Sequence, residues 1–234
     1  MEPRIWLTSD WHLGHDREFI WKARGFNSVE DMNWSIINKH NSRVLPDDDV
    51  YVLGDLTLGP ATNIELIEKM NGKLHIVRGN HDTDARWALY LNLPNVVEMK
   101  NAIYLKYKQH YFYMSHYPSM TGNLEKESLK QTTINLYGHT HQKDNFYLDM
   151  PFMYHVGIDS HFCLPVCLDD AIKEMYAKVE ECKDLLYIEE ERNTENSYRD
   201  KFCHKCSWEG IKCYGPMPWS PDQCPIGRSF KQDP

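Results

Sequence analysis

The first half of the chain alternates short apolar runs with longer amphipathic segments. The apolar runs are bounded by turn residues and predict buried strands at residues 4–9, 50–53 and 74–78. The segments between and after them predict helices at residues 28–40, 62–70 and 84–91. Ser28 begins the first helix, with the acidic Asp31 three residues later, which is typical of a capped helix start. We expect this helix to lie on a sheet.

The middle of the chain has a different pattern. Runs rich in aromatic and β-branched residues at 96–99, 102–107 and 110–114 are separated by two or three turn residues, which predicts strands linked by hairpins. Two further strands are predicted at 133–137 and 154–159. From Asp169 the period becomes helical, and its apolar stripe consists of Ile172, Met175, Tyr176, Val179, Cys182 and Leu186. The charged segment that follows is typical of a linker or an exposed helix end.

Composition limits the classes of protein to consider. The chain has 234 residues, of which 41% are hydrophobic, enough for one large core with a small appendage. No apolar stretch approaches the length of a membrane span, and the first residues lack a signal-peptide pattern, so we expect a cytoplasmic protein without a membrane partner. Seven cysteines, an odd number, favour reduced thiols. The net charge of −8 argues against sequence-independent binding of duplex nucleic acid, which requires a basic face.

Polar clusters follow directly after the first two predicted strands. Asp10 and His12 lie two residues apart, so their side chains would leave the same face of an extended segment. For this pair alone, a hydrogen bond between the carboxylate and the imidazole is the alternative interpretation. Asp55 follows Gly54 after the second strand. Burying an unpaired carboxylate is costly, and a metal ion would give Asp55 a reason to face inward.

Three further clusters are of the same chemical kind. The third strand leads into Gly79-Asn80-His81-Asp82, where the glycine permits a sharp turn before an amide oxygen, an imidazole and a carboxylate. An ordinary turn is the alternative for this stretch alone, because all three residue types are common in turns. His116 follows a later strand, and His139 and His141 follow Gly138. Two histidines two residues apart in an extended segment are typical of metal ligands.

Taken in order, these clusters resemble the signature of the calcineurin-like metallophosphoesterases over about residues 1–190. The resemblance implies a mixed α/β fold, a four-layer α/β/β/α sandwich, with a dinuclear metal centre at the strand ends. It also implies roles for the residues that match the signature. The first metal would be held by Asp10, His12 and His141, the second by Asn80, His116 and His139, and Asp55 would bridge them. His81 would lie just outside the coordination sphere, and Asp82 would orient it.

The donor set also predicts chemistry. Nitrogen and oxygen ligands without sulfur suit two divalent ions, manganese first, with iron, zinc, cobalt or nickel as alternatives. Two ions about 3.5–4 Å apart lower the pKa of a shared water towards neutrality and generate an attacking hydroxide. His81, as an imidazolium, would then protonate the leaving oxygen.

We therefore predict hydrolysis of a small phosphate ester, a phosphodiester or a nucleotide-type substrate that includes cyclic nucleotides. A phosphomonoesterase acting on nucleotides or proteins is one alternative. The other is a non-catalytic metal-binding scaffold that recruits partners through its tail. A short single-stranded nucleic acid is also open as a substrate, because its bases could stack on the aromatic residues Trp11, Trp21 and Tyr117.

The segment 191–234 is predicted to be a linker and a tail with its own cysteines. Cys203 and Cys206 precede a Trp and a Gly, and Cys213 and Cys224 follow, which resembles half of a zinc ribbon. The second knuckle is incomplete, because Gly227 stands where the resemblance requires a cysteine. A structural zinc held by these four cysteines is open, with Cys213 or His204 as the substitute fourth ligand. A Pro-rich tail with reduced thiols is the alternative.

Overall fold

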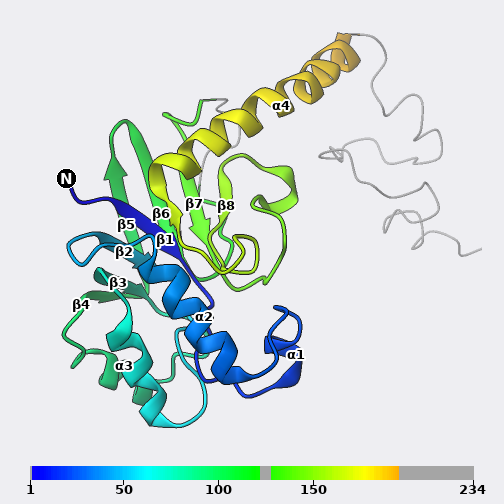
Figure 1. Ribbon diagram of the computed structural model, residues 1–234. Coiled ribbons are helices and arrows are strands. Elements are labelled where there is room, and N and C mark those ends of the chain that lie inside the picture. The colour runs from blue at the N-terminus through cyan, green and yellow to red at the C-terminus, as the bar shows by residue number, and fades with distance from the viewer. Residues whose placement is uncertain (1, 122–127, 195–234) are drawn as a thin grey trace, which may run out of the picture. The chain divides into compact units, whose positions relative to one another are not determined.

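The computed structural model describes residues 2–121 and 128–194, with side chains described as far as residue 182 (Figure 1). The chain divides into two compact units, Met1–Val179 and Glu180–Pro234. Both sheets lie within the first unit. Cys203, Cys206, Cys213 and Cys224 lie outside the described residues, so the zinc-ribbon tail and the predicted boundary at residue 190 stay predictions. Among the described residues, no helix combines the length and apolar character needed to cross a membrane.

The first sheet has the strand order β4-β3-β2-β1-β9. Four of its strands are parallel, and the short β9 runs antiparallel beside β1. Their bounds are Ile5–Thr8 for β1, Asp49–Val52 for β2, Lys73–Val77 for β3, Val96–Lys100 for β4 and Val166–Cys167 for β9. The predicted strands at 4–9, 50–53 and 74–78 are thus confirmed to within a residue or two.

The second sheet has the order β5-β6-β7-β8. β5 and β6 form an antiparallel hairpin, whereas β6, β7 and β8 are parallel to one another. Their bounds are Ala102–Tyr107 for β5, His110–Ser115 for β6, Thr133–Tyr137 for β7 and Met153–His155 for β8. The two sheets and the helices around them confirm the expected mixed α/β fold.

Helical segments connect β1 to β2, β2 to β3 and β3 to β4, another lies between β7 and β8, and the last follows β9. The described chain contains α1 (Glu18–Trp21), α2 (Val29–Asn41), α3 (Asp84–Tyr90) and α4 (Leu168–Thr194), with 3-10 segments η1 (Ala61–Lys69) and η2 (Tyr147–Asp149). The Ser28 hydroxyl accepts a hydrogen bond from the Asp31 N–H at 3.1 Å, so the predicted cap of α2 is confirmed. The predicted helix at 62–70 is a 3-10 segment instead of an α-helix.

Side chains of the first sheet alternate between two apolar clusters. Val50 and Val52 pack with residues of α2, η1 and α3, which cover one face of that sheet (Figure 1). Tyr51 and Leu53 belong to the other cluster, which also contains the apolar faces of β6 and β7 and the start of α4. Burial on both faces explains why the strands read as continuous apolar runs, as parallel strands commonly do.

Two sequence predictions about strands were wrong. β4 and β5 do not form a hairpin, because β4 pairs with β3 in the first sheet and β5 pairs with β6 in the second. The strand predicted at 154–159 ends at His155. Beyond it, Gly157 forms an isolated bridge with Ser9, which brings this segment beside the end of β1. The local pattern shows neither that β4 pairs with the preceding β3 nor that the segment after β8 meets residue 9.

The direction of the strands places the polar clusters together. β1, β2 and β3 are parallel, so their carboxyl ends meet at one edge of the first sheet. β6 and β7 are parallel in the second sheet and end together in the same way. The loops that follow these five strands carry all seven predicted metal ligands.

Candidate metal centre

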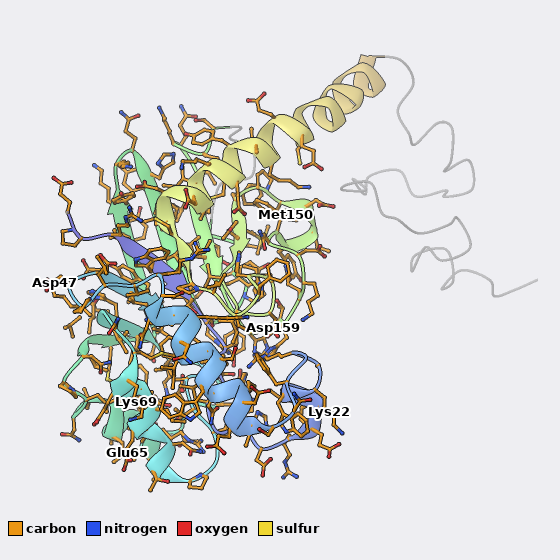
Figure 2. The ribbon with its side chains drawn as sticks, in the orientation of Figure 1. Lys22, Asp47, Glu65, Lys69, Met150 and Asp159 are labelled. Carbon is orange, nitrogen blue, oxygen red and sulfur yellow. The ribbon has the colours of Figure 1, made fainter. Side chains whose placement is uncertain are left out.

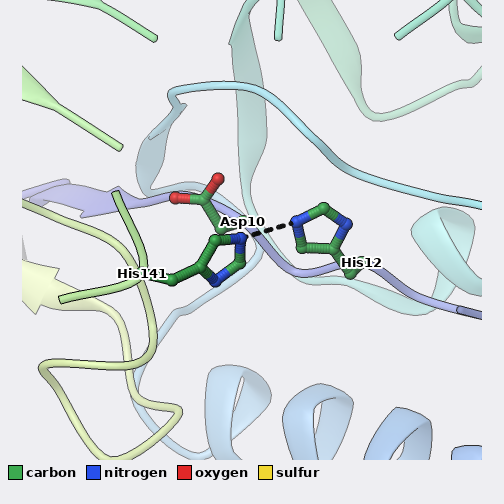
Figure 3. A group of neighbouring side chains, drawn as sticks. All are labelled: Asp10, His12 and His141. Carbon is green, nitrogen blue, oxygen red and sulfur yellow. Dashed lines mark hydrogen bonds between the residues drawn. The ribbon is translucent and has the colours of Figure 1, made fainter. Parts of the chain in front are cut away.

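Asp10, His12 and His141 converge, although 129 residues separate His12 from His141 (Figure 3). Their donor atoms lie within 4.8 Å of one another, and the Nε2 atoms of the two histidines are 3.1 Å apart. Asp10 Oδ1 is buried and has no hydrogen-bond partner among the described residues. An orphaned buried carboxylate oxygen beside two imidazole nitrogens fits a bound cation.

A second group lies next to the first. Asp10, Asp55 and His116 have donor atoms within 4.8 Å of one another. Asn80 Oδ1 lies 2.8 Å from His116 Nε2 and 2.9 Å from His139 Nδ1. His116 Nδ1 lies 2.7 Å from the Leu53 carbonyl, which accepts its proton and leaves Nε2 of a neutral ring with a free lone pair. That lone pair then faces the Asn80 oxygen, an arrangement that a cation would stabilise.

Asp55 lies between the two groups. Its Oδ2 atom is 3.7 Å from Nε2 of His12 and 3.6 Å from Nε2 of His116. Its Oδ1 atom accepts a hydrogen bond from the backbone N–H of His81 at 2.8 Å. The Asp55 side chain is about 2% exposed, so it cannot obtain its solvation from bulk water. One oxygen of Asp55 therefore faces donors of both groups.

Five of the predicted ligands have left-handed backbone conformations. The φ angles are 60° at Asp10, 50° at His12, 56° at Asp55, 69° at His139 and 49° at His141. We expected extended segments, with side chains two residues apart on one face, and this expectation was wrong. Positive φ is uncommon for non-glycine residues and clusters at functional sites, although Asp and His tolerate it better than most. The side chains converge because the backbone turns at these left-handed residues and is not extended.

Glycines at the site allow close approach between loops. A Cβ atom on Gly79 would lie 2.2 Å from Asp55 Oδ1, and one on Gly138 would lie 2.6 Å from Asp10 Oδ2. The chain does turn after Gly79, where the Asp82 N–H donates to the Gly79 carbonyl at 3.3 Å, but Gly79 itself does not adopt a positive φ. The glycine leaves room for the carboxylate of Asp55.

The His81 ring lies at the open side of the two groups. Its side chain is 45% exposed, and its Nε2 atom is 4.0 Å from Asp55 Oδ2. The ring also contacts the edge of His12, with centroids 5.5 Å apart. The His81 ring can therefore contact the two donor groups and also a molecule that enters from solvent.

The expectation that Asp82 orients His81 needs correction. Asp82 Oδ2 accepts hydrogen bonds from the backbone N–H groups of Gly79 and Asp55, at 2.8 and 2.9 Å. Its Oδ1 atom accepts from the N–H of Leu56 and from the Tyr90 hydroxyl. Among the described residues these contacts occupy the carboxylate, which holds the backbone of the loops after β2 and β3 instead of the His81 ring.

Burial and neighbouring charges shift the pKa values of the donors. Burial raises the pKa of the Asp10 carboxyl to about 6, against the lowering effect of nearby His116 and His141. Burial lowers the pKa of His12 well below its usual range, and the Arg24 charge adds to this effect. Burial also lowers the pKa of His139. These shifts keep His12 and His139 neutral, which is the form that binds a cation.

His141 behaves differently because it has a carboxylate partner. Burial alone would lower the pKa of His141, but the hydrogen bond to Asp159 and the charge of Asp10 raise it. His141 Nδ1 and Asp159 Oδ2 are 2.7 Å apart. Asp159 and its partner Arg24 were not predicted from the sequence. Asp159 follows a strand-like run, as Asp10 does, and that signal could have identified it.

The aromatic residues near the motifs have different environments. Trp11 is buried, and its indole N–H donates to the Thr8 hydroxyl at 2.9 Å, so it belongs to the core and is not available to a nucleic acid strand. Trp21 packs against the same core. Tyr117 is 50% exposed, and its ring centroid lies 4.6 Å from that of His139.

Comparison with known proteins gives a family match over most of the described chain. A family model described as the calcineurin-like phosphoesterase superfamily domain matches residues 4–156. A protein of Methanocaldococcus jannaschii, named only as uncharacterized, is 40% identical over 82 residues, which are 34% of this chain and 47% of that protein. The match therefore spans less than half of that relative. The gene 66 protein of Mycobacterium phage L5 is 24% identical over 160 residues, 58% of this chain and 76% of that protein.

One solved structure is similar over nearly its whole length. A crystal structure of a protein of unknown function from Aquifex aeolicus superposes with a TM-score of 0.56 and 18% sequence identity. The match covers 74% of this chain and 99% of that one. At this identity, the similarity concerns the fold.

Proposed function

Because the chain belongs to the calcineurin-like phosphoesterase superfamily, we propose that it hydrolyses phosphate esters with two divalent metal ions. One observation carries the proposal: two groups of Asp and His donors, all buried except the half-buried His141, meet at the strand ends and share Asp10, with Asp55 between them. We assign Asp10, His12 and His141 to the first ion, and Asn80, His116 and His139 to the second, with Asp55 on both.

The bound ions would supply Lewis acidity towards phosphate oxygens and would lower the pKa of a coordinated water, and Asp10 and Asp55 would neutralise only part of their charge. The chain's own residues hold this centre rigidly. The Asp10 N–H donates to the Gly54 carbonyl and the His12 N–H to the Asp55 carbonyl, both at 3.0 Å. These bonds tie the first ligand loop to the loop that carries Asp55.

His81 is the group we propose as the proton donor to the leaving oxygen. Its ring is partly exposed, and its backbone N–H is fixed to Asp55 Oδ1. As a hydroxide oxygen bonds to phosphorus and the ester P–O bond breaks, the proton on Nε2 would pass to the departing oxygen, and the ring would become neutral. A positioned acid of this type contributes about 10²–10⁴-fold to the rate.

A nucleotide-type or other small phosphodiester is the substrate class we propose. The exposed Tyr117 ring lies against the ring of His139, beside the second donor group. Phe19, which is 70% exposed, contacts the edge of His15, whose ring lies 5.5 Å from that of His12. Exposed rings on both sides of the donors would let a base or another flat group stack, with its phosphate at the centre.

The test uses metal-stripped protein supplied separately with Mn²⁺, Zn²⁺, Mg²⁺ or Fe²⁺. Each sample is assayed with a chromogenic phosphodiester, a chromogenic phosphomonoester and a panel of nucleotides that includes cyclic ones. We expect no turnover without metal, the best recovery with Mn²⁺ and faster hydrolysis of the diesters. Asp55→Asn should abolish recovery, whereas Asp47→Asn, at an exposed position, should not.

Each contrary result has a definite meaning. Faster hydrolysis of the monoester would make the protein a phosphomonoesterase. Absence of turnover with every metal, in protein that binds two ions, would favour the non-catalytic scaffold. Unaltered turnover after complete removal of metal would overturn the proposal.

A further inference from the structure

A buried ion pair lies directly behind the first donor group. Arg24 donates from Nε to Asp159 Oδ1 at 3.0 Å and from Nη2 to Asp159 Oδ2 at 2.9 Å, a two-pronged contact. The Arg24 and Asp159 side chains are 2% and 7% exposed. Asp159, labelled in Figure 2, belongs to the segment between β8 and β9, and Arg24 lies shortly after α1. Neither residue is among the assigned ligands.

Arg24 also fixes the backbone of the first ligand loop. Its Nη2 donates to the Asp10 carbonyl at 2.7 Å and its Nη1 to the Trp11 carbonyl at 2.9 Å. Both carbonyls lie between the two left-handed residues, Asp10 and His12. A buried guanidinium with several fixed acceptors can hold a strained backbone that would otherwise relax.

Asp159 fixes the second ligand loop through a side chain. Its Oδ2 atom accepts from His141 Nδ1 at 2.7 Å as well as from Arg24. With Nδ1 protonated, the Nε2 atom of a neutral His141 ring carries the lone pair, and it is this atom that faces His12. Metal-binding histidines commonly donate their second N–H to a carboxylate in this way, which sets the tautomer and the ring orientation.

We propose that Arg24 and Asp159 are positioning residues that hold Asp10, His12 and His141 in register for the first metal ion. The pair joins two loops separated by more than 100 residues in sequence, because one guanidinium contacts the Asp10 loop and its carboxylate partner contacts His141. The second donor group has its own support, since the Leu53 carbonyl orients His116. His12 and His141 belong to the first group alone, so we expect loss of the pair to weaken the first ion selectively, although the groups share Asp10. The inference rests on the proposed two-ion site.

Asp159→Asn is the most specific variant, because it preserves the shape of the side chain and replaces one of its two acceptor oxygens by an NH₂ group. The carboxylate accepts three hydrogen bonds, whereas an amide has only one oxygen and would turn its NH₂ group towards an N–H donor. We expect about a 10- to 100-fold weaker affinity for one of two Mn²⁺ ions, with the other unchanged. Isothermal titration of the full chain measures both affinities. Electron paramagnetic resonance at stoichiometric Mn²⁺ should show a coupled pair in the wild type and a single ion in the variant.

Matched variants separate positioning from folding. Asp144→Asn, at an exposed carboxylate three residues after His141, should keep both affinities. The double variant Arg24→Gln/Asp159→Asn leaves no unpaired buried charge and should show the same selective loss if the single variant does not fold. Two unchanged affinities in folded Asp159→Asn or double-variant protein would overturn the inference. A wild type that does not bind two ions would instead overturn the proposed function.

Discussion

At the scale of single residues, the site depends on backbone conformations that side chains rarely adopt. Five of the proposed ligands have positive φ, at a cost on the order of 1–3 kcal/mol each. Hydrogen bonds from Arg24 to two loop carbonyls, and from the loop N–H groups to neighbouring carbonyls, offset that cost. Strain of this kind pre-organises donors, so that a cation meets ligands already in position.

His81→Asn tests the assignment of the proton donor. Because the His81 ring lies beside the ligands and not between them, we expect turnover to fall by about 10²–10⁴-fold with both metals retained. Steady-state kinetics and metal analysis of the same sample measure the two effects. His75→Asn is the control, because His75 lies between Asp49 and Glu98, away from the donors. Loss of a metal from the His81 variant would make His81 a ligand.

Gly79→Ala tests the close approach between the ligand loops. The new methyl group would meet Asp55 Oδ1 at 2.2 Å, so the carboxylate between the two groups has to move. We expect fewer than two bound ions and a loss of about 1–3 kcal/mol in the free energy of unfolding. Metal analysis and urea denaturation measure these changes.

Gly72→Ala provides the comparison for this variant. Gly72 has a φ of 98°, and a methyl group there would meet Val50 Cγ2 at 2.6 Å, so alanine adds strain of about 1–2 kcal/mol in the core without contacting a proposed ligand. Both ions should stay bound in this control. Two ions bound to Gly79→Ala with unchanged affinity would show that Asp55 has more freedom than the contacts indicate.

At the scale of elements, α2 contacts the loop after β1 through one buried histidine, His40, whose ring packs on Trp11. His40 of α2 is buried, with Nε2 2.9 Å from the Asn71 carbonyl and its ring edge-on to Trp11. Its Nδ1 atom has no hydrogen-bond partner among the described residues. Burial lowers the pKa of His40 to about 4, opposed in part by the hydrogen bond to Asn71.

This shift predicts a pH dependence of stability. Between pH 6.5 and about 4, His40 takes up a proton in the unfolded chain and not in the folded one, so the unfolded state binds more protons and stability falls as pH falls. In His40→Gln this loss should shrink, by at most about 1.4 kcal/mol per pH unit. Urea denaturation of both proteins, freed of metal with a chelator, measures how steeply the free energy of unfolding changes between pH 6.5 and about 4. Identical slopes in both proteins would contradict the prediction.

The sequence predicted the strand ends well because each apolar run is followed by a polar cluster. Asp10, Asp55 and His116 could be identified in this way before their convergence was known. It did not predict the left-handed backbone, since residue types do not fix φ, nor Arg24 and Asp159, whose contact spans 135 residues. Asp48 lies in a run of three acidic residues, 47–49, which gives no sign of burial, yet it is buried and accepts hydrogen bonds from Trp6 and Arg4. Such contacts join segments that are far apart in sequence, so the local pattern of residues does not predict them.

At the scale of the whole molecule, the described unit carries the complete proposed site. The predicted zinc in the tail is a separate question with its own test. We expect Cys203→Ser/Cys206→Ser to lose one zinc per chain relative to the wild type, because two thiolate ligands of the predicted site are removed. Elemental analysis measures this loss, with Cys167→Ser, a half-buried thiol of β9, as the control. Equal zinc content in all three proteins would favour reduced thiols without metal.

The two-ion site is the claim on which the proposed function and the inference about Arg24 and Asp159 depend. Its most direct test is anomalous diffraction from crystals of the full chain grown with Mn²⁺, recorded on both sides of the manganese edge. We predict two anomalous peaks about 3.5–4 Å apart. One should contact Asp10, His12 and His141, the other Asn80, His116 and His139, and Asp55 should contact both. A single peak, or peaks that Asp55 does not reach, would contradict the account.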